Sequence, residues 1–314
     1  MSWFTPRRGG TRRDNPDGTM PLVEHLYELR SRLAIALIAI ALTTVLGFIW
    51  YGTSLFGLPS IGQLLLGPYC SLPASARPIL SENGNCVLAA TGAFDQFNLR
   101  LRVSVAVGVV LASPVWFMQL WGFITPGLYA KERKYAVVFV SIAASLFVAG
   151  AILAYFVVAQ GLAFLLTIGD DVQITLLTGE SYFGLMIALL LIFGASFELP
   201  LLVVMLSFAG VVSYETLAKA RRGLIFGLFV FAAVATPGGD PISMTALAVA
   251  LTVLFEIAIQ IAKINDRRRA LQAEKLAEMD YDTPSEIDTS PSVIPPPAEL
   301  PEAVRDEHRY GDST

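Results

Sequence analysis

Charged side chains are scarce in this sequence. Asp, Glu, Lys and Arg make up 15% of its 314 residues, whereas hydrophobic residues reach 54% and the mean hydropathy is +0.61. Soluble domains carry about 25% charged residues, so this composition excludes a soluble globule and indicates a polytopic membrane protein. The net charge of -4 reflects acids that are concentrated in the C-terminal tail, because the loops before the tail are basic.

Residue patterns typical of catalysis and metal binding are also missing. The sequence has two histidines, His25 and His308, and neither belongs to a His-Glu-x-x-His motif. It contains no Walker-type phosphate loop and no Gly-x-Ser-x-Gly motif. These absences argue against an enzyme. They predict neither a metal nor a cofactor, and we expect no nucleic-acid partner.

Only two cysteines are present, Cys70 and Cys86, and both lie in a long loop at residues 52–102 that we place outside the cytoplasm. In an oxidising compartment such a pair is more typical of a disulfide than of metal ligands or a nucleophile. We therefore expect a disulfide, with two free thiols as the alternative.

Long hydrophobic runs are what the sequence does have. A bilayer core needs about 20 helical residues, and six segments qualify. They are residues 33–51, 103–124, 135–168, 182–212, 223–236 and 242–262. The first has about thirty polar residues before it and no small-residue cleavage site after it, so we expect a retained span and not a signal peptide. The predicted fold is an all-α membrane protein with six transmembrane helices.

The last two segments are poor spans. The fifth is confined between Arg222 and Pro237 and would cover only about 21 Å at 1.5 Å per residue. The sixth is interrupted by Glu256. Two short neighbouring spans imply local bilayer thinning or shielding by a partner.

The distribution of basic residues predicts the orientation. With both termini in the cytoplasm, Arg77, Arg100 and Arg102 are the only three of the 22 Lys and Arg residues that fall outside. This pattern requires an even number of spans. We expect three regions: a disordered basic extension at residues 1–20, a six-span membrane domain at 21–265, and a charged, Pro-rich and largely disordered cytoplasmic tail at 266–314. No internal repeat of the kind that builds many transporters is visible.

One acidic residue lies inside an apolar run. Glu198 falls within the fourth segment, and Pro200 follows two residues later. An ionised carboxylate at the bilayer centre costs about 2.5–3.5 kcal/mol on insertion scales, so such a residue indicates a functional site. Pro200 would bend the helix at the same place. The alternative is a protonated Glu198 that a neighbouring helix caps.

Two acidic sites stand out among the basic cytoplasmic segments. Glu24 and Glu28 lie four residues apart on a predicted amphipathic helix, whose apolar stripe is Leu22, Leu26, Leu29 and Leu33. Glu132 lies in a tight loop among Lys131, Arg133 and Lys134. From the residues alone, a purely structural role and a binding role remain equally open for both sites.

Six motifs in order resemble the TatC family, the polytopic subunit of the twin-arginine protein translocase. They are HLYELR at residues 25–30, FITPGLYAKER at 123–133, AYFVV at 154–158, SFELP at 196–200, TPGGD at 236–240 and FEI at 255–257. The resemblance covers about residues 20–265 and follows the order of the spans. The N-terminal extension, the acidic tail and the two cysteines depart from the family pattern.

The resemblance implies a function and its residues. The family binds signal peptides with two adjacent arginines at its cytoplasmic face, and a guanidinium pairs best with a carboxylate. The implied signal-peptide residues are Glu28, Glu132, Arg30, Phe123, Leu128 and Tyr129. The implied intramembrane and partner-docking residues are Glu198, Pro200, Glu256 and Asp240.

The resemblance also implies partners and a location. We expect TatA- and TatB-type single-span proteins, folded cargo carrying twin-arginine signal peptides, and further copies of the chain itself. The location would be the bacterial cytoplasmic membrane, with export driven by the proton-motive force. The alternative is a proton-coupled secondary transporter that uses Glu198 or Glu256. A membrane-embedded enzyme ranks third, because it would need a nucleophile or metal ligands.

Overall fold

The structure is a computed structural model that describes residues 22–55, 57–72, 86–124, 133–168 and 177–282. The chain divides into two units, residues 1–267 and 268–314. All contacts discussed below lie within the first unit. Within the described ranges every named element is a helix, and the only β-pairing is two isolated bridges. The all-α prediction is confirmed for these residues.

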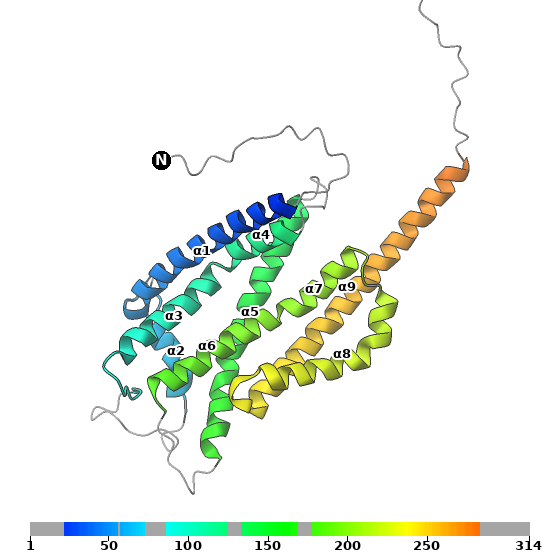
Figure 1. The fold of residues 1–314 in the computed structure, drawn as a ribbon. Coiled ribbons are helices and arrows are strands. Elements are labelled where there is room, and N and C mark those ends of the chain that lie inside the picture. The colour runs from blue at the N-terminus through cyan, green and yellow to red at the C-terminus, as the bar shows by residue number, and fades with distance from the viewer. Residues whose placement is uncertain (1–21, 56, 73–85, 125–132, 169–176, 283–314) are drawn as a thin grey trace, which may run out of the picture. The chain divides into compact units, whose positions relative to one another are not determined.

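Apart from the helix at Ile61–Cys70, which lies in the loop predicted at residues 52–102, and the short turn at Pro237–Gly239, the helices overlap the predicted hydrophobic segments (Figure 1). In chain order they are α1 (Leu22–Gly52), α2 (Ile61–Cys70), α3 (Asp95–Leu111), α4 (Ser113–Ile124), α5 (Arg133–Thr167), α6 (Gly179–Ser196), α7 (Glu198–Phe208), α8 (Tyr214–Ala235), the 3-10 turn η3 (Pro237–Gly239) and α9 (Pro241–Asp282). Part of the predicted tail is therefore helical, because α9 continues to Asp282.

Four described stretches are long and apolar enough to cross a membrane: His25–Gly52, Val137–Thr167, Gly179–Phe208 and Pro241–Glu278. A fifth is obtained if α3 and α4 form one broken span. The predicted fifth segment lies in α8, which is 22 residues long but does not qualify as a span, because its first turns carry several charged residues. The described helices thus supply four or five spans by this measure, where the sequence predicted six.

The second predicted segment is not a single straight helix. α3 ends at Leu111, α4 begins at Ser113, and the two are bent by 58°. Pro114 explains the break, because a proline has no N–H and its ring clashes with the carbonyl four residues earlier, here that of Val110. The hydrophobic run predicted one span at 103–124, and Pro114 is the residue in the sequence that indicates the break within it.

Small residues let the helices approach one another closely. A side chain at Gly47 of α1 would lie 3.0 Å from the Ser104 carbonyl oxygen of α3. The hydroxyl of Thr43 donates to the Gly108 carbonyl at 2.8 Å in the same contact. Between α5 and α6, an added Cβ at Gly150 would lie 2.5 Å from the Phe193 carbonyl oxygen. Such close approach gives van der Waals contact that the hydrophobic effect cannot supply between helices in lipid.

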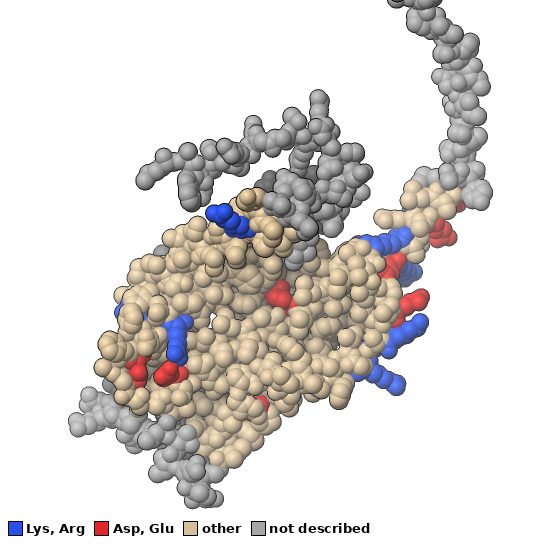
Figure 2. Space-filling view, viewed as in Figure 1, with Lys and Arg blue, Asp and Glu red and all other residues tan. Residues whose placement is uncertain are grey.

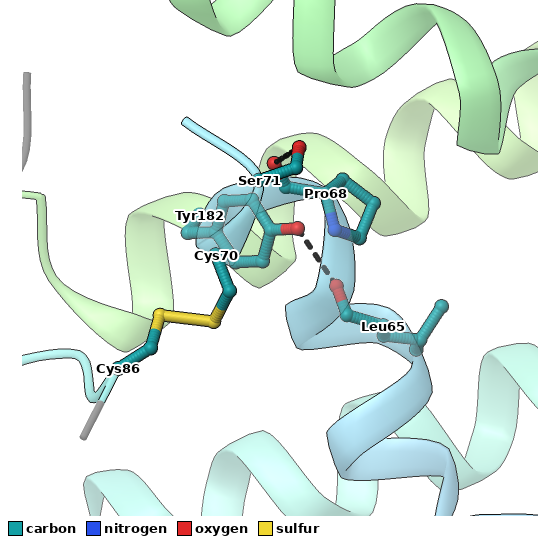
Figure 3. Close-up of a disulfide and its surroundings, with 6 residues drawn as sticks. All are labelled: Leu65, Pro68, Cys70, Ser71, Cys86 and Tyr182. Carbon is teal, nitrogen blue, oxygen red and sulfur yellow. Dashed lines mark hydrogen bonds between the residues drawn. A yellow bond between two sulfur atoms is a disulfide. The ribbon is translucent and has the colours of Figure 1, made fainter. Parts of the chain in front are cut away.

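Helix α2 is held by a disulfide and two tyrosines, and Figure 3 shows the disulfide and one of these tyrosines, Tyr182. Cys70 is bonded to Cys86, with a Cα–Cα distance of 5.8 Å. Pro68 lies inside α2 and removes the N–H that would bond to the Leu64 carbonyl. The hydroxyl of Tyr155 in α5 donates to that carbonyl at 3.0 Å, and Tyr182 in α6 donates to the Leu65 carbonyl at 2.7 Å. The loop that contains the cysteines is therefore anchored to α5 and α6.

Helices α8 and α9 are joined side by side. Arg221 of α8 forms an ion pair with Glu256 of α9 at 2.9 Å. The backbone N–H of Tyr214, at the start of α8, donates to the Asp266 carboxylate at 2.7 Å. Leu217 packs with Ile259 in a small buried cluster between these contacts.

Candidate functional site

The acid predicted on the first helix is engaged by a cation. Nε and Nη2 of Arg32 donate to the same oxygen of Glu28, Oε1, at 3.1 and 2.5 Å. The two residues are four apart on α1, so they lie on one face of the helix. Their side chains are only 27% and 26% exposed. Glu28 therefore already holds a guanidinium group from its own chain.

The ion pair lies against the C-terminal end of α4. Gly122 faces the guanidinium, because a Cβ at this position would lie 2.8 Å from Cζ of Arg32. One residue further, the ring of Phe123 stacks on His25 of α1 with ring centroids 4.4 Å apart and an interplanar angle of 18°. Together these contacts bring Glu28, Arg32 and Phe123 to one end of the α1–α4 pair.

Helix α1 exposes its apolar face and packs with its polar face, which is the reverse of an amphipathic helix in a soluble protein. Leu26, Leu29 and Leu33 of the predicted apolar stripe are 62%, 38% and 53% exposed, while Glu28 and Arg32 face α4. In lipid an exposed leucine is not penalised, whereas a charged group gains from a protein partner. The polar face of α1 thus becomes its contact face.

The structure locates only part of the predicted signal-peptide site. Glu28 and Phe123 lie at the same helix pair, and Arg30 is exposed, with no ion pair among the described residues. Glu132, Leu128 and Tyr129 lie outside the described residues. Sequence reasoning missed Arg32, Gly122 and His25. The four-residue spacing of Glu28 and Arg32 could have identified the pair, but nothing local pointed to Gly122.

The second candidate region surrounds Glu198. It is the first residue of α7, after a break in the helix at Phe197, and Pro200 is buried in the first turn that follows. The Glu198 side chain is half-buried, and its Oε1 is shielded and accepts no hydrogen bond in the part of the chain described. A hydrogen bond from a neighbouring helix, which would give Glu198 a purely structural role, is therefore not found at Oε1 within the described ranges. The face of the molecule shown in Figure 2 carries few charged side chains over most of the membrane helices.

Asp240 and Glu256 are engaged within the chain. Asp240 is 1% exposed, and its Oδ1 accepts from the backbone N–H of Ser243 at 2.6 Å, so it caps the start of α9. Glu256 forms the ion pair with Arg221 and also accepts a long bond from Gln260 at 3.4 Å. A partner-docking role for either residue stays a prediction. The transporter alternative would use Glu198 or Glu256, and of these two acids only Glu256 has an ion pair among the described residues.

A cavity of about 350 Å³ lies beside the disulfide-anchored loop. Two acids line it, but both are already bound within the chain. Asp95 accepts from the backbone N–H groups of Thr91 and Gly92 at 2.9 and 2.6 Å, and Glu180 pairs with Arg102 at 2.9 Å. Across the described residues, no group of three His, Cys, Asp or Glu side chains is arranged to hold a metal ion.

Comparison with known proteins gives a consistent result. The family model described as "Sec-independent protein translocase protein (TatC)" matches residues 24–249. A relative with that name from Corynebacterium kroppenstedtii is 48% identical over 291 residues, which cover 90% of this chain and 70% of the relative. A namesake from Frankia casuarinae is 45% identical over 278 residues, or 87% of this chain and 74% of the relative.

Solved structures agree with the sequence comparison. A crystal structure of a "Twin Arginine Translocase Receptor- TatC in DDM" is 30% identical and superimposes with a TM-score of 0.60. The match covers 76% of this chain and 99% of that one.

Proposed function

Because the chain belongs to the TatC family and is thus a subunit of a bacterial Sec-independent protein translocase, we propose that it is the signal-peptide receptor of that translocase. It would bind the twin arginines of folded cargo proteins at the cytoplasmic face of the bacterial plasma membrane. It would then organise TatA- and TatB-type single-span partners for export driven by the proton-motive force. The family is a transport component and not a class of enzyme.

One observation carries the receptor proposal. Glu28 accepts two hydrogen bonds from a guanidinium group in a partly buried position at the end of the α1–α4 pair. Arginine is the residue whose planar fork suits a carboxylate, so a site that holds one guanidinium is chemically suited to another. Glu132, Leu128 and Tyr129 would complete the site, as the family resemblance implies.

The proposed topology has six spans with both termini in the cytoplasm. The bent α3–α4 pair would form the second span, α8 the short fifth span and α9 the sixth. The distribution of Lys and Arg supports this arrangement, because it leaves only three basic residues outside. The disulfide between Cys70 and Cys86 would then lie in the extracytoplasmic loop between the first two spans.

Binding of signal peptides tests the receptor role directly. We expect the purified full chain in lipid nanodiscs to bind a fluorescent Arg-Arg signal peptide more tightly than a Lys-Lys version, by about tenfold or more, since an ammonium cannot donate as a planar fork. Fluorescence anisotropy would measure both affinities. Equal affinities for the two peptides would rule out recognition of the arginines.

Glu198 offers a test of partner assembly. We expect Glu198→Ala to insert normally but to recover substantially less of a tagged single-span partner in co-purification, because the half-buried, uncapped carboxyl would no longer be available to the partner. Glu180→Ala is the matched control, since Glu180 also lies in the first turn of a helix but is exposed and paired with Arg102. Unchanged partner recovery with Glu198→Ala would show that the residue is only tolerated.

A further inference from the structure

We propose that Arg32 occupies Glu28 in the unliganded chain as an internal substitute for a signal-peptide arginine, and that it thereby sets the affinity of the site. This inference rests on the receptor function proposed above. It assigns Arg32 a positioning role that acts through Glu28. Signal binding would exchange one guanidinium for another at the same carboxylate.

The geometry of the pair favours an exchange. Both donors of Arg32 converge on Oε1 of Glu28, at 3.1 and 2.5 Å. A second guanidinium at that carboxylate would lie within a few ångströms of Arg32, where two like charges repel. Glu28 is also already neutralised, so it attracts an incoming cation less strongly than a free carboxylate would. A signal arginine therefore binds Glu28 fully only after Arg32 has moved away.

The position of Arg32 depends on α4 as well as on α1. Gly122 leaves the space that the guanidinium fills, since an alanine Cβ there would lie 2.8 Å from Cζ and 3.3 Å from Nη2 of Arg32. The stacked His25 and Phe123 rings hold the adjoining turns of the two helices together. A single methyl group on α4 is thus sufficient to displace Arg32 while its charge is retained.

Opening the pair has the same free-energy cost for every peptide, because it precedes binding. The apparent dissociation constant equals the intrinsic one divided by the fraction of chains in which Glu28 is free. Removing Arg32 should therefore lower the apparent dissociation constants of the Arg-Arg and Lys-Lys peptides by the same factor. An arginine that touched the peptide directly would instead change the ratio of the two affinities.

Binding of both labelled peptides to the full chain in nanodiscs tests this. Arg32→Gln is expected to lower both dissociation constants about three- to tenfold, with their ratio unchanged. Gly122→Ala should shift both in the same direction without a change of charge. Arg222→Gln, an exposed arginine on α8 without an ion pair in the described ranges, controls for net charge. Gly227→Ala, with no atom within 4 Å of the added Cβ, controls for the glycine substitution.

The dependence on Glu28 separates the possible outcomes. In a Glu28→Gln background, Arg32→Gln should no longer tighten binding. If Glu28→Gln weakens binding but neither Arg32→Gln nor Gly122→Ala strengthens it in the wild-type background, the inference fails and the receptor function stands. If Glu28→Gln leaves Arg-Arg binding unchanged, the assignment of Glu28 in the proposed function fails. If Arg32→Gln does not fold, Gly122→Ala alone still tests whether displacing Arg32 from Glu28 strengthens peptide binding.

Discussion

Replacing Glu132 with alanine is expected to weaken binding of an Arg-Arg signal peptide about tenfold or more. Each hydrogen bond to a charged group contributes about 1.5–3 kcal/mol, less when exposed to water, and 1.4 kcal/mol corresponds to a factor of ten. Glu132→Gln should weaken the binding of this peptide as well, because the amide keeps the shape of the carboxylate but loses its charge. Glu28→Gln should act in the same direction. If each acid binds a different arginine, replacing both acids should weaken the affinity for the peptide by the product of the two single factors.

The identity of the peptide provides the control. A Lys-Lys peptide should bind weakly to the wild-type chain and lose little further when Glu132 is replaced. Glu180→Gln is the matched protein control for Glu28→Gln, because each removes the acid of an ion pair, here the 2.9 Å pair of Glu180 with Arg102. If Glu132→Ala reduced the affinity of Arg-Arg and Lys-Lys peptides equally, Glu132 would shape its loop and would not recognise the signal.

Loss of the disulfide is expected to lower the free energy of unfolding by about 3 kcal/mol. This estimate follows from the chain-entropy model for a loop of 16 residues, the separation of Cys70 and Cys86. The loop is otherwise tied to the membrane helices by the bonds from Tyr155 and Tyr182 to α2. The double variant Cys70→Ser, Cys86→Ser should therefore unfold at lower denaturant concentration in detergent, with α5 and α6 still formed.

Adding a reductant gives an independent measure of the contribution of the disulfide. It should lower the free energy of unfolding of the wild-type chain by about as much as the double substitution does, and it should leave that of the double variant unchanged. Thiol labelling of the denatured, unreduced wild-type chain should find no reactive cysteine. Two reactive thiols per chain would contradict the disulfide.

Local chemistry made several features predictable. The apolar runs identified the helices, because the backbone of a lipid-embedded segment must satisfy its own hydrogen bonds. The i,i+4 spacing of Glu28 and Arg32 and the break at Pro114 are likewise local features that the sequence alone contains. The all-α class and the positions of most helices followed directly.

Contacts between distant segments could not be predicted in this way. Nothing near Gly122 in the sequence indicates that it makes room for Arg32, which comes ninety residues earlier. Two carbonyl groups of α2 accept hydrogen bonds from Tyr155 and Tyr182, which lie on two other helices. Glu256 looks unpaired in the sequence, but Arg221 of α8 forms an ion pair with it.

The membrane class, the helical fold and the unusual positions of the acidic residues followed from the sequence alone, because hydropathy, charge and helical spacing act over a few residues. The packing of the helices determines which of those acids already have partners. Glu28, Asp240 and Glu256 have partners, while Oε1 of Glu198 accepts no hydrogen bond from the residues described. The reason is physical: the energy of a charge depends on the groups within a few ångströms of it, and in a packed helical bundle most of those come from other helices.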